Sequence, residues 1–258
     1  MIRKVLIAGG GTGGHLFPGL AVVEEFRRRT SSVEFLFVGT QRGIEARILP
    51  ERGENVRFVS VAPLKGKRGR ALAQAASALP KASLESSRIL REFRPDLVLG
   101  VGGYAAGPMV ATAALMRIPT AILEQNAHVG LTNRLLARMV GRAYLSFDET
   151  VAHFPRDTVR VTGNPVRRAF VEAARRASVD PDGFEARTSH VLVVGGSQGA
   201  EALNRSLPDL LQKAGIRGSG LKVLHQSGER MRAEVEAAYR HAGIEAEVVS
   251  FIEDMESA

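Results

Sequence analysis

The sequence contains no cysteine and no tryptophan, and only three of its 258 residues are tyrosine. Without cysteine the chain has neither a disulfide framework nor a cysteine-ligated metal site, which is compatible with the cytoplasm. The net charge of +8 favours an acidic partner: a nucleic acid, an anionic lipid or a phosphorylated substrate. Because aromatic side chains that stack on bases are scarce, we expect no nucleic acid partner.

The sequence also lacks an apolar run typical of a membrane span. The uncharged segment 97–116 has glycines and a proline in its middle, so we predict a strand, a loop and a helix there. The apolar run in residues 1–8 is too short for a signal peptide. We therefore expect a cytosolic protein that touches a membrane without crossing it.

Residues 5–15, VLIAGGGTGGH, are the centre of the sequence pattern. An apolar run followed by glycines and a helical pattern predicts a strand, a tight loop and a helix whose first amides face an anion. The spacing of these glycines fits the dinucleotide pattern G-x-G-x-x-G, which alone is a weak signal. A dinucleotide site would place an acid at the end of the second strand, but residues 39–42 read GTQR, and Glu45 falls inside the next predicted helix. This argues against a dehydrogenase.

Strand and helix patterns alternate along the whole chain, which predicts an α/β protein with parallel sheets. Gly9 aligns with Gly195 and Gly13 with Gly199 at a constant offset, which indicates two similar domains in tandem. We predict a first Rossmann-like domain at residues 1–162 and a second, incomplete one at 163–258. The expected strands are residues 5–8, 33–38, 56–61, 97–101, 120–123, 143–147 and 159–162 in the first domain, and 191–194, 222–226 and 247–250 in the second.

Of the six histidines, His15 is the candidate base, because a helix N-terminus should lower its pKa and favour the neutral form. The alternative is a histidine that only caps the turn. Ser197 and Gln198 in the second-domain loop are placed to hold a diphosphate leaving group. Arg167 follows a Gly-Asn-Pro turn, where it either pairs with phosphate or forms an interdomain salt bridge.

Two further segments allow two interpretations each. The polar residues 124–126 end a predicted strand, where α/β proteins bind ligands, but glutamine and asparagine also cap helices. The basic cluster 64–70 is either a solvated loop or a contact with anionic lipid. The helical pattern of residues 71–93 contains Pro80, which we expect to break or kink the helix.

Seven ordered motifs together span essentially the whole chain: residues 9–22, 100–108, 124–133, 163–167, 195–200, 225–228 and 251–255. These motifs resemble those of the MurG family of peptidoglycan glycosyltransferases. That family has the GT-B fold, in which two Rossmann-like domains with parallel sheets face a cleft, and it inverts the anomeric centre. The resemblance implies transfer of N-acetylglucosamine from UDP-N-acetylglucosamine to lipid I, forming lipid II at the cytoplasmic face of the membrane without cofactor or metal.

The resemblance also implies roles for particular residues. His15 is a candidate base for the acceptor C4 hydroxyl, and Glu124 is a second candidate for the base or for orienting the acceptor. The first-domain loops, with Gly10, Gly11, Gly102, Gly103 and Tyr104, are expected to receive the acceptor diphosphate. The implied contacts of the donor are Thr12, Gly13, Gly14, Asn126, Arg167, Ser197, Gln198 and Ile252.

The chain departs from the family pattern in three respects. Leu123 stands where many members have histidine, the helix after the basic cluster lacks aromatic residues, and the family continues past residue 258 with segments that recognise uracil, ribose and the sugar. A rival hypothesis follows, in which the chain is a truncated, inactive or acceptor-binding-only relative of such an enzyme.

Overall fold

The computed structural model describes residues 2–30, 32–61, 77–177, 190–196, 199–216, 220–252 and 255. The chain divides into two compact units, residues 1–168 and 169–258. This division falls just after the turn at residues 163–167. The basic cluster 64–70 and the two donor-loop residues Ser197 and Gln198 lie outside the described part of the chain.

The first unit is built on a seven-stranded sheet of order β3-β2-β1-β4-β5-β6-β7, in which every pairing is parallel. Strand β1 is buried on both faces because its residues 5–8 are all apolar. The strand order reverses between β1 and β4, and ligands of open α/β sheets bind beyond the carboxyl ends of the strands at such a point. The strands are β1 (Lys4–Ala8), β2 (Glu34–Gly39), β3 (Val56–Phe58), β4 (Leu97–Gly100), β5 (Thr120–Glu124), β6 (Arg142–Leu145) and β7 (Val159–Val161).

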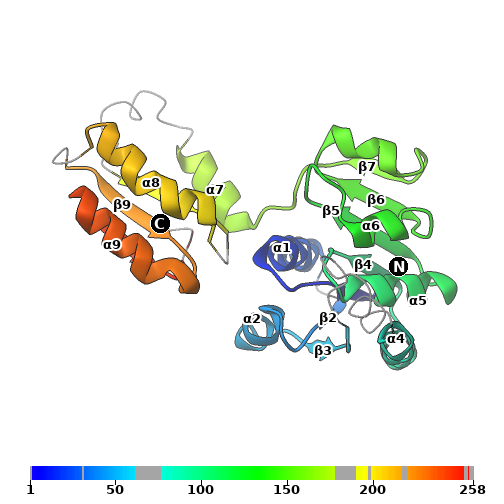
Figure 1. The fold of residues 1–258 in the computed structure, drawn as a ribbon. Helices are drawn as coiled ribbons and strands as arrows, with labels where there is room; N and C mark the ends of the chain where they lie inside the picture. The colour runs from blue at the N-terminus through cyan, green and yellow to red at the C-terminus, as the bar shows by residue number, and fades with distance from the viewer. Residues whose placement is uncertain are drawn as a thin grey trace. The chain divides into compact units, whose positions relative to one another are not determined.

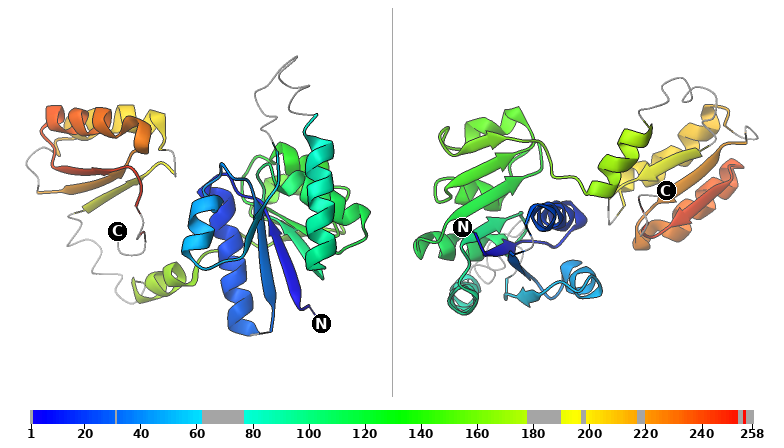
Figure 2. Two further views of the ribbon diagram at one scale, coloured as in Figure 1. Left: turned by 90° about the horizontal axis from the view of Figure 1, so that it is seen from below. Right: turned by 180° about the vertical axis from the view of Figure 1, so that it is seen from behind.

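Helices cover both faces of this sheet (Figures 1 and 2). Apolar residues of α1 and α2 form one core with Val5 and Ile7, and those of α4, α5 and α6 form a second core with Leu6 and Ala8. Successive side chains of β1 therefore point to opposite faces of the sheet and pack into two separate hydrophobic cores. The helices are α1 (Gly13–Arg29), α2 (Glu45–Glu51), α4 (Leu79–Phe93), α5 (Ala106–Leu115) and α6 (Leu131–Leu136), with a 3₁₀ helix η1 (Asp148–His153) before β7.

Segment 97–116 forms β4, a loop and α5, as predicted, and none of the described helices is long and apolar enough to span a bilayer. The expectation that Pro80 breaks the helical pattern is confirmed, because the described helix does not extend before Leu79. Helix α4 begins at Leu79, so Pro80 lies in its first turn, where the missing N–H costs no helical hydrogen bond. Strand β3 is shorter than predicted, since it ends at Phe58.

The second unit contains a three-stranded parallel sheet of order β10-β9-β8 in its described part. Helices α8 and α9 lie on one face of the sheet (Figure 2), over a core that includes Val193, Val223, Val235, Tyr239 and Val248. The elements are α7 (Arg168–Ala177), β8 (His190–Val194), α8 (Glu201–Lys213), β9 (Lys222–Gln226), η2 (Glu229–Met231), α9 (Arg232–Ala242) and β10 (Ala246–Val249). The three strands predicted for this part of the chain are all present.

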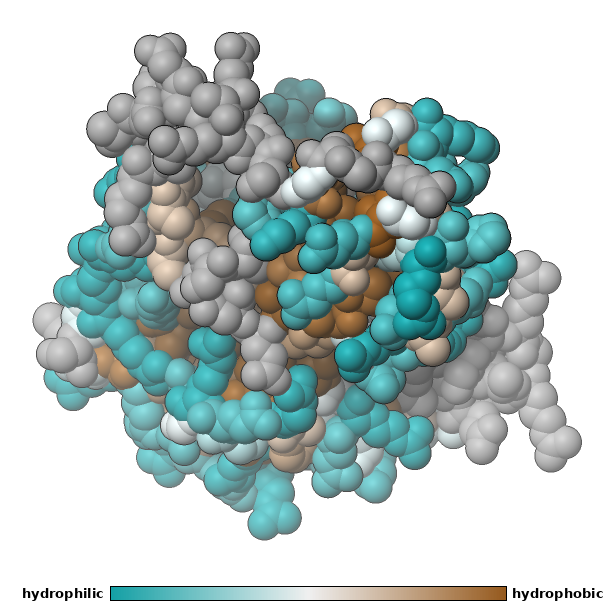
Figure 3. All heavy atoms as spheres, turned by 90° about the vertical axis from the view of Figure 1, so that its left-hand side faces the viewer, coloured by the Kyte–Doolittle hydropathy of each residue, from teal (hydrophilic) through white to brown (hydrophobic). Residues whose placement is uncertain are grey.

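Some apolar side chains of the second unit are exposed. Leu192 and Val194 on β8, and Leu203 and Leu210 on α8, each expose 40% or more of their surface. Figure 3 shows hydrophobic residues gathered at the surface on the side of the molecule from which it is drawn.

Candidate active site

The glycine loop after β1 leads directly into helix α1. Gly9, Gly10 and Gly11 all have positive φ, so the loop takes a path that other residues rarely adopt. The Gly9 amide donates to the Val38 carbonyl at 2.9 Å, which ties the loop to β2. Thr12 is the N-cap but makes no side-chain cap bond, and the first amides of a helix have no acceptor within it. The start of α1, at Gly13 and Gly14, is therefore suited to binding an anion.

A second glycine loop, after β4, packs backbone to backbone against the first. The Gly10 amide donates to the Gly102 carbonyl at 3.3 Å. A Cβ at Gly103 would overlap the Gly10 carbonyl, and one at Gly9 would overlap the Gly102 carbonyl, so only glycine fits these positions. Tyr104 follows, partly exposed. The structure thus brings together the loop residues expected to receive the acceptor diphosphate.

His15 lies in the first turn of α1, beside both loops. Its Nδ1 is 3.3 Å from Thr12 Oγ1, and its ring lies so close to Gly102 that a Cβ there would be 2.6 Å from the ring. Burial lowers the pKa of His15, while a backbone hydrogen bond at Gly10 and the charges of Glu124 and Glu45 act in the opposite direction. The predicted direction is right, but the largest cause is burial. A neutral imidazole at pH 7 can accept a proton.

Glu124, at the end of β5, is buried, and its carboxylate accepts four hydrogen bonds. Oε1 accepts from the backbone and side-chain nitrogens of Asn126, at 3.1 and 3.0 Å. Oε2 accepts from the Gly130 amide at 2.9 Å and from Asn133 Nδ2 at 3.1 Å. With two donors on each oxygen, this geometry favours the orienting role for Glu124 over the role of base, and it holds Asn126 in place.

Arg167 has an aromatic partner in the first unit. Its guanidinium lies 5.0 Å from the ring centroid of Phe17, a cation–π contact with the residue two positions after His15. The contact places a positive charge next to α1. The two roles predicted for Arg167, phosphate binding and an interdomain salt bridge, stay predictions.

In the second unit, Gln226 links the loop after β8 to the segment after β10. Its Nε2 donates to the Gly196 carbonyl at 2.7 Å, and its Oε1 accepts from the Ile252 amide at 2.8 Å. The loop after β8 carries Ser197 and Gln198, so this buried amide connects two segments expected to hold the donor. Sequence reasoning missed Gln226, although its place at the end of a strand, inside the motif 225–228, was an available signal.

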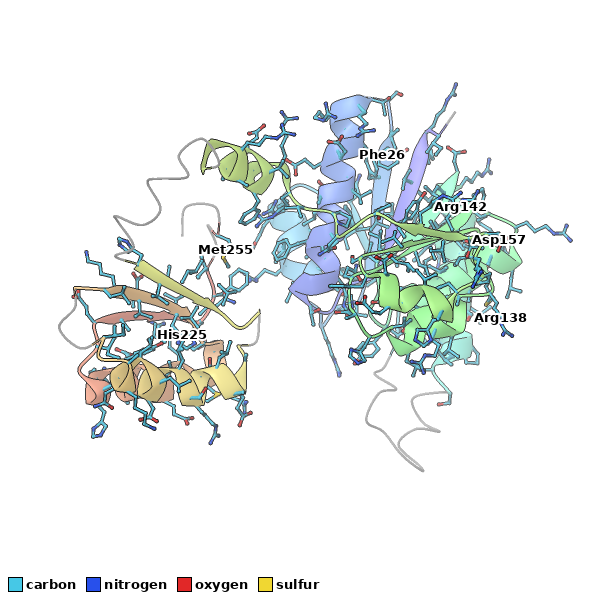
Figure 4. The ribbon with its side chains drawn as sticks, turned by 90° about the horizontal axis from the view of Figure 1, so that it is seen from above. Phe26, Arg138, Arg142, Asp157, His225 and Met255 are labelled. Carbon is cyan, nitrogen blue, oxygen red and sulfur yellow. The ribbon has the colours of Figure 1, made fainter. Side chains whose placement is uncertain are left out.

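His225 links β9 to helices α8 and α9 through the side chains of Asn204 and Tyr239 (Figure 4). Asn204 Nδ2 donates to the Ser227 carbonyl at 2.7 Å, so Asn204 Oδ1 must accept from His225 Nε2 at 3.0 Å. His225 Nδ1 then accepts from the Tyr239 hydroxyl at 2.9 Å. Burial lowers the pKa of His225 and raises the pKa of Tyr239 to about 12. The structural role predicted for His225 agrees with this network.

Sequence reasoning also missed the place of Glu45. It lies in α2, as the sequence predicted, but its side chain is fully buried next to the first glycine loop. The glycines before it, Gly39 and Gly43, were the available signal. Within the described residues, no three histidine, cysteine, aspartate or glutamate side chains are grouped as a metal site would require.

The family models match both halves of the chain. Residues 5–145 match the glycosyltransferase family 28 N-terminal domain, and residues 190–258 match the C-terminal domain of the same family. The chain belongs to glycosyltransferase family 28. Its curated relatives carry the MurG enzyme's full name, UDP-N-acetylglucosamine--N-acetylmuramyl-(pentapeptide) pyrophosphoryl-undecaprenol N-acetylglucosamine transferase. The MurG family resemblance is therefore confirmed.

Two such relatives cover almost all of this chain. The one from Myxococcus xanthus is 48% identical over 100% of this chain and 66% of its own length. The one from Geobacter sulfurreducens is 45% identical over 99% of this chain and 70% of its own length. The chain thus spans about two thirds of the length of the curated relatives it matches.

Solved structures confirm the fold class. Acinetobacter baumannii MurG superposes with a TM-score of 0.66 at 29% identity, covering 99% of this chain and 68% of that one. A UDP-GlcNAc 2-epimerase from Neisseria meningitidis has a TM-score of 0.63 at 13% identity, covering 98% of this chain and 74% of that one, which shows a common fold only. The predicted GT-B class, with two Rossmann-like units of which the second is partial, is confirmed.

Proposed function

We propose that this chain transfers N-acetylglucosamine from UDP-N-acetylglucosamine to lipid I, forming lipid II. The observation that carries the proposal is the place of His15, a half-buried neutral imidazole beside two interlocked glycine loops at the point where the strand order reverses. Membership in family 28 supports this reaction class. UDP-N-acetylglucosamine and lipid I are the two substrates, and no cofactor or metal takes part.

The reaction is a single displacement at the anomeric carbon of the donor sugar. The C4 hydroxyl of the acceptor muramyl sugar attacks that carbon while neutral His15 takes the hydroxyl proton. The bond between the anomeric carbon and the UDP oxygen breaks, UDP leaves with the electron pair, and the configuration inverts. Glu124 orients the acceptor through the loop that it holds.

The two diphosphates bind at different loops in this proposal. Gly10, Gly11, Gly102, Gly103 and Tyr104 form the acceptor surface, and the positive end of the α1 dipole stabilises the negative charge of the acceptor diphosphate. The donor diphosphate and its leaving group are held by the second-unit loop with Ser197 and Gln198. The remaining donor contacts of the proposal are Thr12, Gly13, Gly14, Asn126, Arg167 and Ile252.

We place the protein at the cytoplasmic face of the cell membrane, as a peripheral protein on the anionic inner-membrane surface. Helix α4 packs against α5 and α5 against α6, and exposed apolar side chains on these helices include Leu84, Leu115 and Leu135. Arg134 and Arg138 lie in the same stretch as Leu135. Apolar side chains among cations support contact with acidic headgroups.

Replacement of the base tests the function. His15→Ala should lower the rate of sugar transfer to a soluble lipid I analogue by about 100-fold or more, the usual effect of losing a general base. His241→Ala is the matched control, because His241 is exposed on α9, outside the proposed site. An unaltered rate in His15→Ala would remove this residue from the role. If the unmodified chain binds the acceptor analogue but transfers no sugar, the acceptor-binding-only alternative is the correct one.

A further inference from the structure

Glu45 is a buried carboxylate that the proposed reaction does not use. It is the first residue of α2, and its side chain is fully buried. Oε2 accepts from the Gly11 amide at 2.7 Å, and Oε1 accepts from the Thr40 amide at 2.8 Å and the Thr40 hydroxyl at 3.0 Å. The carboxylate therefore ties the end of β2 to the glycine loop after β1.

Glycines surround this carboxylate on several sides. A Cβ at Gly10, Gly39 or Gly43 would overlap the Glu45 carboxylate. Among the described residues, no lysine or arginine forms an ion pair with it. The charge is held by backbone amides and one hydroxyl, and a buried charge needs such donors to offset its loss of hydration.

The position of this charge explains why the loop does not act as a dinucleotide site. In dinucleotide-binding units, the loop after the first strand binds a pyrophosphate, and an acid at the end of the second strand binds the ribose. Here no acid stands at that strand end, and the carboxylate of Glu45, from the following helix, accepts hydrogen bonds from the Gly11 amide and from the Thr40 amide just after the strand. The amides that remain for an external anion are at the start of α1, next to His15.

We propose that Glu45 is a positioning residue of the acceptor site. Its carboxylate acts as an internal anion that fixes the Gly10–Gly11 backbone, and through it the place of the His15 ring and of the free amides of α1. This inference rests on the proposed function where it concerns acceptor binding, whereas the effect on the loop does not depend on any ligand.

The donor set around Glu45 requires a carboxylate. Three donors converge on two acceptor oxygens, so the side-chain amide of a glutamine would turn an N–H toward either Gly11 or Thr40. Glu45→Gln has nearly the same volume and still replaces an acceptor with a donor. Glu51→Gln is the matched control, because Glu51 is exposed on the same helix.

The first experiment needs no ligand and uses NMR on the whole chain, with circular dichroism to show that each variant is folded. Glu45→Gln should speed hydrogen exchange of the Gly11 amide by about tenfold or more, which corresponds to about 1.4 kcal/mol of lost protection. It should also lower the pKa of the His15 ring, because the Glu45 charge raises that pKa. Glu51→Gln should change neither. Wild-type exchange and titration in folded Glu45→Gln would overturn the proposal.

The second experiment measures calorimetric binding of a soluble lipid I analogue with a short prenyl chain. Glu45→Gln should weaken binding by about tenfold, and Glu51→Gln should bind like the wild type. Unchanged binding in Glu45→Gln would overturn the acceptor part of the proposal. If the wild-type chain does not bind the analogue, the proposed function fails, and the ligand-free experiment still decides the role of Glu45 in the loop.

Thr40→Val provides a milder test if Glu45→Gln does not fold. It removes one of the three hydrogen bonds and keeps the carboxylate. Gly11 exchange should become faster in Thr40→Val than in the wild type, by less than in Glu45→Gln. Exchange equal to that of the wild type would contradict the proposal.

Discussion

The glycine loops after β1 and β8 hold the same place in their units and are supported by different chemistry. In the first unit, the buried carboxylate of Glu45 and the backbone of a second glycine loop hold the loop. In the second unit, the neutral amide of Gln226 holds the loop, and the Ser227 carbonyl lies against Gly199. Two glycine loops that follow the first strand of their units can therefore be held by different groups. A charged carboxylate holds one loop, and an uncharged side-chain amide holds the other.

The largest expected effect comes from adding a Cβ where each loop packs against the backbone of a neighbouring loop. Gly103→Ala and Gly199→Ala each put a Cβ on a backbone carbonyl at a positive φ, of Gly10 and Ser227 respectively. Each should lower the free energy of unfolding by about 3 kcal/mol or more, because backbone on both sides has no room to move. Denaturant titration followed by circular dichroism measures the effect.

Alanine substitution at glycines that have a positive φ but no nearby atoms measures the cost of the backbone conformation without the cost of a steric clash. Gly53 in the first unit and Gly196 in the second have no atom within 4 Å of a Cβ built on them. Alanine at either position should cost about 1 kcal/mol, the price of the left-handed conformation alone. Equal losses at Gly199 and Gly196 would show that contact with Ser227 does not constrain the loop.

The next largest effect is expected from removing Asn204 from the hydrogen-bond network that it forms with His225 and Ser227 in the second unit. Asn204→Ala leaves the His225 Nε2–H and the Ser227 carbonyl buried without their partner, so it should cost about 2–3 kcal/mol. Ser206→Ala on the exposed side of the same helix is the control and should stay within about 0.5 kcal/mol of the wild type. A loss as small as that of the control would mean that water replaces Asn204 without cost.

Acid pH should destabilise the second unit through His225. Burial lowers the pKa of His225 below its ordinary value of 6.5, so the neutral form is favoured in the folded state. Stability is then full above pH 6.5 and falls as the pH drops from 6.5 toward the folded-state pKa, by at most about 1.4 kcal/mol per pH unit for one proton.

His15 has a lowered pKa as well, so single variants must separate the two units. Unfolding curves at pH about 7.5 and about 5.5 should show that His225→Gln reduces the acid sensitivity of the second unit and that His15→Gln does not. The same pH dependence of the second unit in His225→Gln and in the wild type would contradict this assignment.

The smallest effect comes from one ion pair in each unit, of which the pair in the first unit includes the largely buried Glu54 side chain. Arg27 donates to Glu54 through its two terminal guanidinium nitrogens, at 2.5 and 2.8 Å, and lies over the Phe35 ring, whereas Arg230 donates to Glu201 through one nitrogen at 2.9 Å. Arg27→Gln should cost about 0.5–1 kcal/mol and Arg230→Gln close to nothing, because exposed single contacts contribute little. Thermal unfolding measures both, and the reverse order would contradict the ranking.

Local patterns in the sequence predicted most of the fold. Apolar runs and glycine positions gave the strands of both units, and the aligned glycines at residues 9 and 195 indicated the duplication. Pro80 marked the start of α4, because proline is tolerated in the first turn of a helix. The end of β3 was predicted three residues too late, because the pairing with β2 ends at Phe58 and the apolar pattern does not show where pairing stops.

The site was predicted in part. The sequence singled out His15 and the glycine loops, because glycine and histidine carry distinctive local chemistry. It did not find Glu45 or Gln226, since each role depends on a hydrogen bond to a distant loop residue, Gly11 for Glu45 and Gly196 for Gln226. The low pKa of His15 was expected from the helix, but it comes mainly from burial, which is a property of the packed unit.

In the proposed function each unit's glycine loop binds a different diphosphate, and amide chemical shifts test this assignment most directly. We predict that UDP added to the ¹⁵N-labelled chain shifts the amides of residues 195–199 and leaves those of Gly102 and Gly103 in place. A soluble lipid I analogue should shift the amides of Gly10, Gly11, Gly102 and Gly103. Shifts of the same loop by both ligands, or by neither, would contradict the account.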